Sequence, residues 1–305
     1  MIQFLRHKEI NKKKWDDCIQ HSANGMVYAF SWYLDVVSPG WNALIEDDYK
    51  KVFPLTWRKK YSIEYLYQPA FTQQLGVFSE EKNISGKSIK EFLDAIPEQY
   101  KLIEIQLNAG NTGLLSNEPA TERLTHHLDL HASYEKIYSG YSENLRRNIK
   151  RAQKNKIEVS HGISPRSVVQ LFRQNKGKNI DRLGTKDYYI LLQLIEAASE
   201  LKLISLAGVQ NEKGKLNAGA MFLKSSHGYI FFFSAVDAEA RSNGSMSLVI
   251  DDFIQRHAGE STLLDFEGSM DKNLARYYKS FGSKEIVYLQ FKKNRLPAYI
   301  RWIKK

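Results

Sequence analysis

The chain has 305 residues, a formal net charge of +10, 43% hydrophobic residues and 12% aromatic residues. This apolar content supports substantial cores and excludes a disordered chain, and the length suits one large domain or two of about 150 residues. The single cysteine, Cys18, excludes an internal disulfide and a metal site made only of cysteines.

No apolar run approaches the ~20 residues that a membrane span needs. The first eight residues mix charged and apolar side chains, so we expect no signal peptide and a cytoplasmic location. The positive charge falls largely in blocks at 12–14, 58–60, 146–156 and 301–305. Such blocks attract polyanions, including RNA and nucleotide cofactors, although solvated surface faces are the alternative interpretation.

The first half of the chain predicts a strand over 2–5, a helix capped by Asn11 that runs through Ile19, and an aromatic helix over 28–37. Three strand-like runs at 41–45, 52–57 and 63–67 predict an antiparallel meander. A long turn over 68–78, a helix over 88–96 and a strand over 102–107 complete this half.

The second half repeats that order of elements. We expect a strand over 157–160, helices over 165–175 and 187–201, and a second meander over 203–209, 218–224 and 229–236. A turn over 237–244 follows, and then a helix over 245–257 that begins at Ser245 or Ser247. A strand over 262–267, a helix over 272–279 and a last strand over 286–291 complete this half. A repeated element order predicts two domains of like design. The fold class is therefore α+β with mixed sheets, divided into residues 1–135 and 136–305.

A basic helix is expected at the entry to the second domain. Ser142 is its predicted N-cap, and Leu145, Ile149 and Ala152 form one apolar face among Lys and Arg residues. A solvated linker helix and an RNA-binding helix are both consistent with this pattern.

The turn at 241–246 reads Arg-Ser-Asn-Gly-Ser-Met and lies between an apolar strand and a helix. A turn of this kind can aim backbone N–H groups at an anionic ligand. It resembles the R/Q-x-x-G-x-G/A pyrophosphate loop of the GNAT acyltransferases, which implies that the cofactor-binding residues are Arg241, Asn243, Gly244, Ser245, Met246 and Ser247. Met246 stands where that family prefers Gly or Ala, and a simple strand-to-helix turn is the alternative.

Two further segments carry a resemblance over residues 200–291. The segment from Ala275 through Tyr278 to Gly282 is similar to the A-x-x-Y-x-x-x-G segment of the GNAT fold. The run 264–269, Leu-Asp-Phe-Glu-Gly-Ser, followed by Tyr-Lys-Ser-Phe-Gly, resembles the second domain of FemABX-type aminoacyl transferases, which are duplicated GNAT-like proteins. The resemblance implies two tandem GNAT-like domains, with the acceptor side in the first and donor binding and catalysis in the second.

Four residues are candidates for the chemistry. The resemblance implies that Tyr278 protonates the departing group, and that Lys279 is a second candidate because FemABX enzymes place a functional lysine nearby. Asp265 and Glu267 alternate on a predicted strand, so they should share a face, and either could accept a proton from an amine. Core packing or ion pairing is the alternative for each. No histidine has a metal-binding pattern, so we expect no metal site.

The resemblance thus implies an N-acyltransferase that moves an acyl group from acetyl-CoA or another acyl-CoA to a primary amine, for which a cell-envelope or polysaccharide precursor is a candidate. One alternative is a FemABX-type transferase that uses aminoacyl-tRNA, with tRNA as a partner. Another is a non-enzymatic basic module that binds RNA or a protein partner, which Met246 favours because its side chain could crowd a pyrophosphate.

Overall fold

The computed structural model describes residues 1–113, 120–180, 183–211, 213–268 and 270–297. The basic block at 301–305 and Ser269 therefore lie outside the described residues. The chain divides into two compact units, residues 1–124 with 286–305 (unit 1) and residues 125–285 (unit 2). This division falls earlier than the predicted boundary after residue 135 and returns the C-terminal segment to unit 1.

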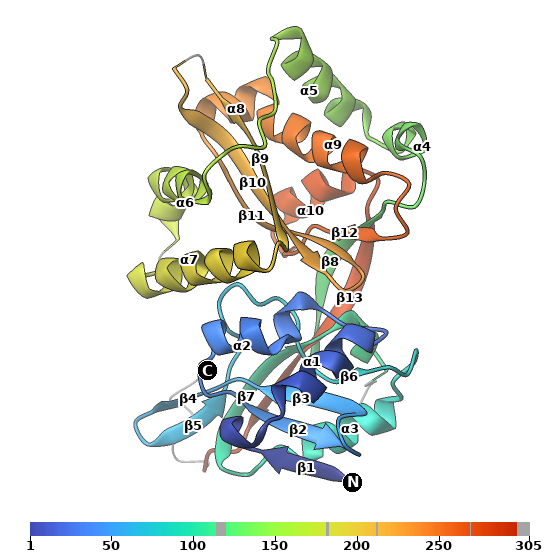
Figure 1. The fold of residues 1–305 in the computed structure, drawn as a ribbon, viewed down its shortest axis with the longest axis vertical. Helices are drawn as coiled ribbons and strands as arrows, with labels where there is room; N and C mark the ends of the chain where they lie inside the picture. Colours follow the sequence, from blue (N-terminus) through green and yellow to red (C-terminus); the bar gives the residue numbers. More distant parts are fainter. Residues whose placement is uncertain (114–119, 181–182, 212, 269, 298–305) are drawn as a thin grey trace. The chain divides into compact units, whose positions relative to one another are not determined.

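Unit 1 contains an antiparallel sheet and a second group of strands (Figure 1). The sheet has the order β1-β2-β3-β6, made by β1 (Ile2–Leu5), β2 (Asn42–Glu46), β3 (Lys51–Leu55) and β6 (Phe78–Ser79). The second group has the order β4-β5-β7-β13, made by β4 (Trp57–Lys60), β5 (Ile63–Leu66), β7 (Tyr100–Leu107) and β13 (Lys284–Asn294). Only β5 and β7 are parallel in this group.

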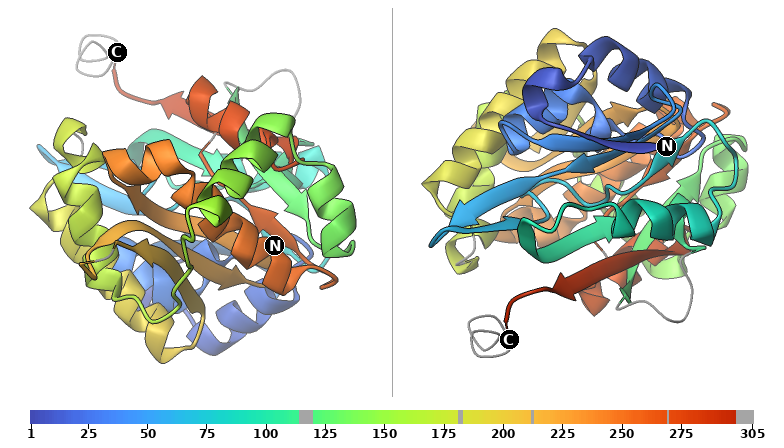
Figure 2. Two further views of the ribbon diagram at one scale, coloured as in Figure 1. Left: turned by 90° about the horizontal axis from the view of Figure 1, so that it is seen from above. Right: turned by 90° about the horizontal axis from the view of Figure 1, so that it is seen from below.

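Helices cover both faces of the first sheet of unit 1 (Figure 2). α1 (Lys12–His21) and α2 (Ser31–Val37) lie on one face and α3 (Gly86–Asp94) on the other. Phe53 packs with Phe92 of α3 in the core, and Trp15 of α1 packs against Trp41 with ring centroids 4.6 Å apart. The predicted Asn11 cap is confirmed, because its side chain accepts a hydrogen bond from the Lys14 amide.

The predicted meander in unit 1 is wrong at Thr56. The run 52–57 divides there into β3 and β4, which belong to different groups of strands. Thr56 is fully buried, and its hydroxyl donates to the Tyr67 carbonyl at 2.6 Å, which fixes the chain where it changes sheet. The basic run 58–60 forms the exposed part of β4.

Unit 2 is built on a sheet with the order β9-β10-β11-β12-β8. Its strands are β9 (Ile204–Gln210), β10 (Leu216–Ser225), β11 (Gly228–Val236), β12 (Leu263–Asp265) and β8 (Ala120–Asp129), of which residues 125–129 belong to this unit. Only β11 and β12 are parallel, and the other neighbours are antiparallel. β8 has no counterpart among the strands predicted from the sequence.

Helices lie on both faces of this sheet as well (Figure 1). One side carries α5 (Glu143–Lys154), α8 (Ala238–Asn243), α9 (Ser245–His257) and α10 (Lys272–Lys279), and the other carries α6 (Pro165–Gln174) and α7 (Thr185–Glu200). A short helix, α4 (Tyr134–Ser139), precedes α5. The predicted cap and apolar face of α5 are confirmed, because Ser142 accepts a bond from the Leu145 amide and the predicted apolar residues are buried.

Three local predictions in unit 2 are wrong. The predicted strand at 157–160 is reduced to an isolated bridge between Ser160 and Gly208. The predicted turn at 237–244 contains α8, because the Asp237 side chain accepts a hydrogen bond from the Ala240 amide and caps that helix. The cap residue of α9 is Gly244, at φ +87°, and both Ser245 and Ser247 lie inside the helix.

Among the helices of the described residues, none combines the length and the apolar composition that a bilayer span requires.

Candidate active site

β11 and β12 form a fork in unit 2. They pair from Gly228 with Leu263 to Ile230 with Asp265, where β12 ends. β11 continues to Val236, and beyond Ile230 the described residues show no further pairing on the β12 side. The strands therefore leave a backbone edge where an extended ligand could add hydrogen bonds.

Aromatic rings pack beneath the open end of the fork. Tyr278 of α10 stacks on Phe266, with ring centroids 5.0 Å apart and planes at 14°. Phe231 of β11 lies 6.1 Å from Phe266 and 6.2 Å from Tyr278. Burial raises the pKa of Tyr278, so its hydroxyl stays protonated at neutral pH. The predicted α10 residue is thus a buried phenol beside the fork.

Asp265 is buried and held by several donors. Its Oδ1 accepts the Thr125 hydroxyl at 2.5 Å and the Glu267 amide at 2.8 Å, and its Oδ2 lies 3.3 Å from His127 Nε2. Since Leu264 lies in the core with α9, alternation along β12 points Asp265 to the opposite face of the sheet from Tyr278. This bonding suits Asp265 for positioning its neighbours.

The structure brings two histidines into this region that sequence reasoning considered only as metal ligands. Register sets His127 of β8 opposite Asp265 of β12, and 24% of the His127 side chain is exposed. His126 points to the other face, where its buried ring lies 6.4 Å from that of Tyr278. Burial lowers the pKa of His126, which keeps its imidazole neutral at pH 7. Only the pairing of β8 with β12 could have revealed these contacts.

Glu267 differs from its predicted setting. It lies beyond the end of β12, and its φ is +56°, so it does not share a strand face with Asp265 as the alternation predicted. Its carboxyl oxygen Oε1 is buried although the residue as a whole is partly exposed. This burial raises the pKa of Glu267 to about 8. A carboxyl group with a pKa near the working pH can exchange protons with an amine.

Lys279 is an exposed residue at the end of α10. Its ammonium lies 3.8 Å from a carboxylate oxygen of Glu285, and 67% of its side chain is exposed. The same Glu285 oxygen lies 3.8 Å from His126 Nε2. Lys279 therefore adds positive charge at the surface beside Tyr278, one residue along the helix.

The predicted phosphate loop is mostly closed. A Cβ on Gly244 would lie 2.4 Å from the Asn148 carbonyl oxygen, because α5 packs directly on this glycine. Asn243 Oδ1 accepts both the amide and the hydroxyl of Ser245, at 3.0 and 2.6 Å. Arg241 lies exposed in the last turn of α8. Of the predicted donors, the amides of Met246 and Ser247 remain in the first turn of α9.

α5 carries an exposed basic face next to α8. Its exposed cations are Arg147, Lys150, Arg151 and Lys154, and the Arg151 guanidinium donates to the Ser242 carbonyl at 2.8 Å. That bond joins α5 to α8, the helix that carries the exposed Arg241. We call Arg147, Lys150, Lys154 and Arg241 the basic face below.

Within the described part of the chain, no three His, Cys, Asp or Glu side chains gather closely enough to share a metal ion.

Comparisons with known structures show that this chain has the fold of FemX. The FemX crystal structure matches with a TM-score of 0.68 at 13% identity, covering 99% of this chain and 100% of FemX. A conserved protein of unknown function from Bacteroides thetaiotaomicron matches with a TM-score of 0.59 at 12% identity, covering 96% and 99% of the two chains. No protein-family model and no curated protein sequence matches. At these identities the likeness establishes the fold, and the predicted α+β, FemABX-like fold is confirmed.

Proposed function

We propose that the protein is an N-acyltransferase that joins an acyl group to a primary amine at the open end of the fork. The observation that carries this proposal is the position of Tyr278 and Glu267 beside a strand edge that β12 leaves unpaired. An extended acyl donor could hydrogen-bond along β11 and present its carbonyl carbon there.

In the proposed reaction the amine nitrogen attacks the carbonyl carbon, and a C–N bond forms as the C–O or C–S bond to the donor breaks. Glu267, as a carboxylate, accepts the proton that the amine loses. Tyr278 donates its proton to the departing oxygen or sulfur. Asp265 is a positioning residue, since it binds the Glu267 amide.

For the donor, we favour aminoacyl-tRNA over acyl-CoA. A pyrophosphate needs several free backbone N–H groups. Here α5 packs against Gly244, and the Ser245 amide already donates to Asn243 Oδ1. The basic face on α5 and α8 offers phosphate contacts of the kind that RNA requires. Acyl-CoA is the second candidate, supported by the amides of Met246 and Ser247 at the start of α9.

The resemblance to FemABX proteins supports a cell-envelope or polysaccharide precursor as the amine, with unit 1 as the acceptor side. The cytoplasmic location is a further expectation from the sequence.

The donor is tested by calorimetric titration of the full chain with acetyl-CoA and, separately, with charged tRNA at low and moderate salt. We expect tRNA to bind with an affinity that falls steeply with salt, and acetyl-CoA to give little heat. Salt-resistant acetyl-CoA binding that is lost in Arg241→Ala would instead assign acyl-CoA as the donor. A third result, uncharged and charged tRNA bound alike with no product from either donor, would favour the non-enzymatic RNA-binding module.

A further inference from the structure

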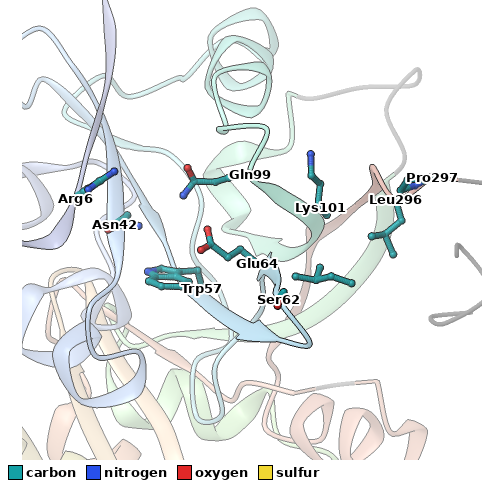
Figure 3. Close-up of a pocket in the computed structure, with 10 residues that line it drawn as sticks. Arg6, Asn42, Trp57, Ser62, Glu64, Gln99, Lys101, Leu296 and Pro297 are labelled. Carbon is teal, nitrogen blue, oxygen red and sulfur yellow. The ribbon is translucent and has the colours of Figure 1, made fainter.

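Unit 1 contains a cavity of about 750 Å³, and the residues proposed for acyl transfer at the fork do not line it (Figure 3). This volume lies within the roughly 300–1,000 Å³ typical of small-molecule sites. The side chains that matter for its chemistry are Arg6, Trp57, Ile63, Glu64, Lys101 and Leu296.

The strands of unit 1 explain why these residues meet. β4 and β5 form a hairpin that brings Trp57 and Ile63 to the cavity, and β5 runs parallel to β7 with Glu64 beside Tyr100. Lys101 follows Tyr100 on β7, while Leu296 follows the end of β13. The cavity is therefore built on paired strands, which hold its lining residues in a fixed arrangement.

One wall of the cavity is apolar and anchored. The Trp57 indole N–H donates to the Gly40 carbonyl at 2.8 Å, which fixes the ring. Ile63 also lines the cavity. Such a surface can bury a hydrocarbon side chain of a ligand.

Opposite charges converge on the cavity without pairing with one another. Figure 3 shows the Glu64 carboxylate near the middle of the view, with Arg6 on one side and Lys101 on the other. In the described part of the chain, none of these three side chains forms an ion pair within 4.0 Å. Their charges are therefore available to a ligand.

The buried hydroxyl of Tyr100 links Glu64 and Arg6 to one region of the cavity. Burial raises the pKa of Tyr100, and the Asn42 amide, which donates to its hydroxyl at 2.7 Å, opposes that rise. The Glu64 and Arg6 charges act on the same hydroxyl in opposite directions. Both charged groups thus lie within electrostatic reach of the same buried hydroxyl.

We propose that this cavity binds a short acidic peptide with a free amino terminus and an apolar side chain. Glu64 pairs with the ammonium group of the ligand, and Arg6 and Lys101 each pair with one of two carboxylates. The apolar side chain lies against Trp57. A polyphosphate is disfavoured because Glu64 would repel it, and a simple cation is disfavoured because two cations flank the carboxylate.

The test is calorimetric titration of the full chain with the dipeptide glutamyl-leucine, which carries one ammonium group, two carboxylates and one apolar side chain. Saturable heat is expected with this peptide. N-acetyl-glutamyl-leucine lacks the ammonium group and glutaminyl-leucine lacks one carboxylate, so each should bind roughly tenfold more weakly. These ligand changes test the charge assignment without altering the protein.

Glu64→Gln and Lys101→Gln should each weaken glutamyl-leucine binding by a similar factor. Lys87→Gln makes the same charge change as Lys101→Gln at a side chain on α3 that is 87% exposed, and it should leave binding unchanged. No saturable heat with the native chain would overturn the proposal. So would equal binding by the native chain and both cavity variants, or equal binding of the three peptides. Because no residue of the fork lines this cavity, either result leaves the roles proposed for Tyr278 and Glu267 standing.

Discussion

At the scale of single residues, Glu267 should give the protein a distinctive pH dependence. Its folded-state pKa of about 8 exceeds the ordinary glutamate value of 4.5, so between these values the folded state holds a proton that the unfolded state releases. Stability from this group is full below the unfolded pKa and falls as pH rises through the folded pKa, by up to about 1.4 kcal/mol per pH unit.

Glu267→Gln should therefore flatten the pH dependence of the free energy of unfolding between pH 5 and pH 8, as measured by urea titration. Glu122→Gln makes the same chemical change at an exposed position and should leave that slope as it is in the native chain. An unaltered slope in Glu267→Gln would show that the carboxyl is not buried in its protonated form.

Catalysis should depend on Glu267 in the opposite sense. The proposed base is the carboxylate, so the transfer rate at saturating substrate should rise with pH through about 8. Glu267→Gln should remove this rise and lower the rate about 100-fold or more. A variant that keeps both the native rate and the native pH profile would exclude this residue as the base.

Tyr278 offers a second test at this scale. Tyr278→Phe removes the proposed acid but keeps the ring that stacks on Phe266, so the rate should fall by about 10²-fold or more with little change in thermal unfolding. Tyr277→Phe is a matched control, because the Tyr277 hydroxyl lies 3.2 Å from Ser247 Oγ and has no role in the proposed proton transfer. Equal rates in the native chain and Tyr278→Phe would reject the assignment.

At the scale of elements, the junction of α5 with α9 depends on Gly244. Gly244→Ala would place a Cβ 2.4 Å from the Asn148 carbonyl oxygen and would also force an alanine to φ +87°. Gly259 has the same φ of +87° and nothing within 4 Å of a Cβ, so Gly259→Ala measures the backbone strain alone. That strain costs about 1–3 kcal/mol, and Gly244→Ala should be clearly more destabilising in chemical denaturation. Equal losses of unfolding free energy in the two variants would mean that α5 does not pack closely against Gly244.

The basic face on α5 and α8 should govern RNA binding. Replacing Lys150 and Lys154 together with Gln should reduce the slope of log affinity against log salt by roughly two units, measured with tRNA. The double change of Lys87 and Lys90 to Gln on α3 of unit 1 controls for total charge. Identical slopes in both double variants would show that tRNA does not contact this face.

The same scale shows what a sequence can predict. Helices with strong periodicity and local caps, such as α1 with Asn11 and α5 with Ser142, follow from neighbouring residues and are confirmed. α8 was missed because Asp237 begins a short helix inside a polar stretch that also suits a turn. β8 pairs with β12 across more than 130 residues of sequence, so the contact between His127 and Asp265 has no local signal. The fold was therefore predictable, whereas the surroundings of Asp265 and Glu267 were not.

At the scale of the whole molecule, the two proposals concern residues of different units. Unit 2 supplies a fork with a buried phenol and a carboxyl group of raised pKa, and unit 1 supplies a cavity with unpaired opposite charges. FemX has the same fold over nearly all of both chains, so both proposals must be tested on the full chain.

The most direct test of acyl transfer is detection of a new amide by mass spectrometry. The full chain is incubated with aminoacyl-tRNA or acetyl-CoA and a panel of primary amines that includes amino sugars and short peptides. We expect an amide product that depends on Glu267 and Tyr278, formed from aminoacyl-tRNA in preference to acetyl-CoA. Absence of an amide with either donor, or equal product from the double variant Glu267→Gln with Tyr278→Phe, would contradict the proposal that the fork is an acyltransferase centre.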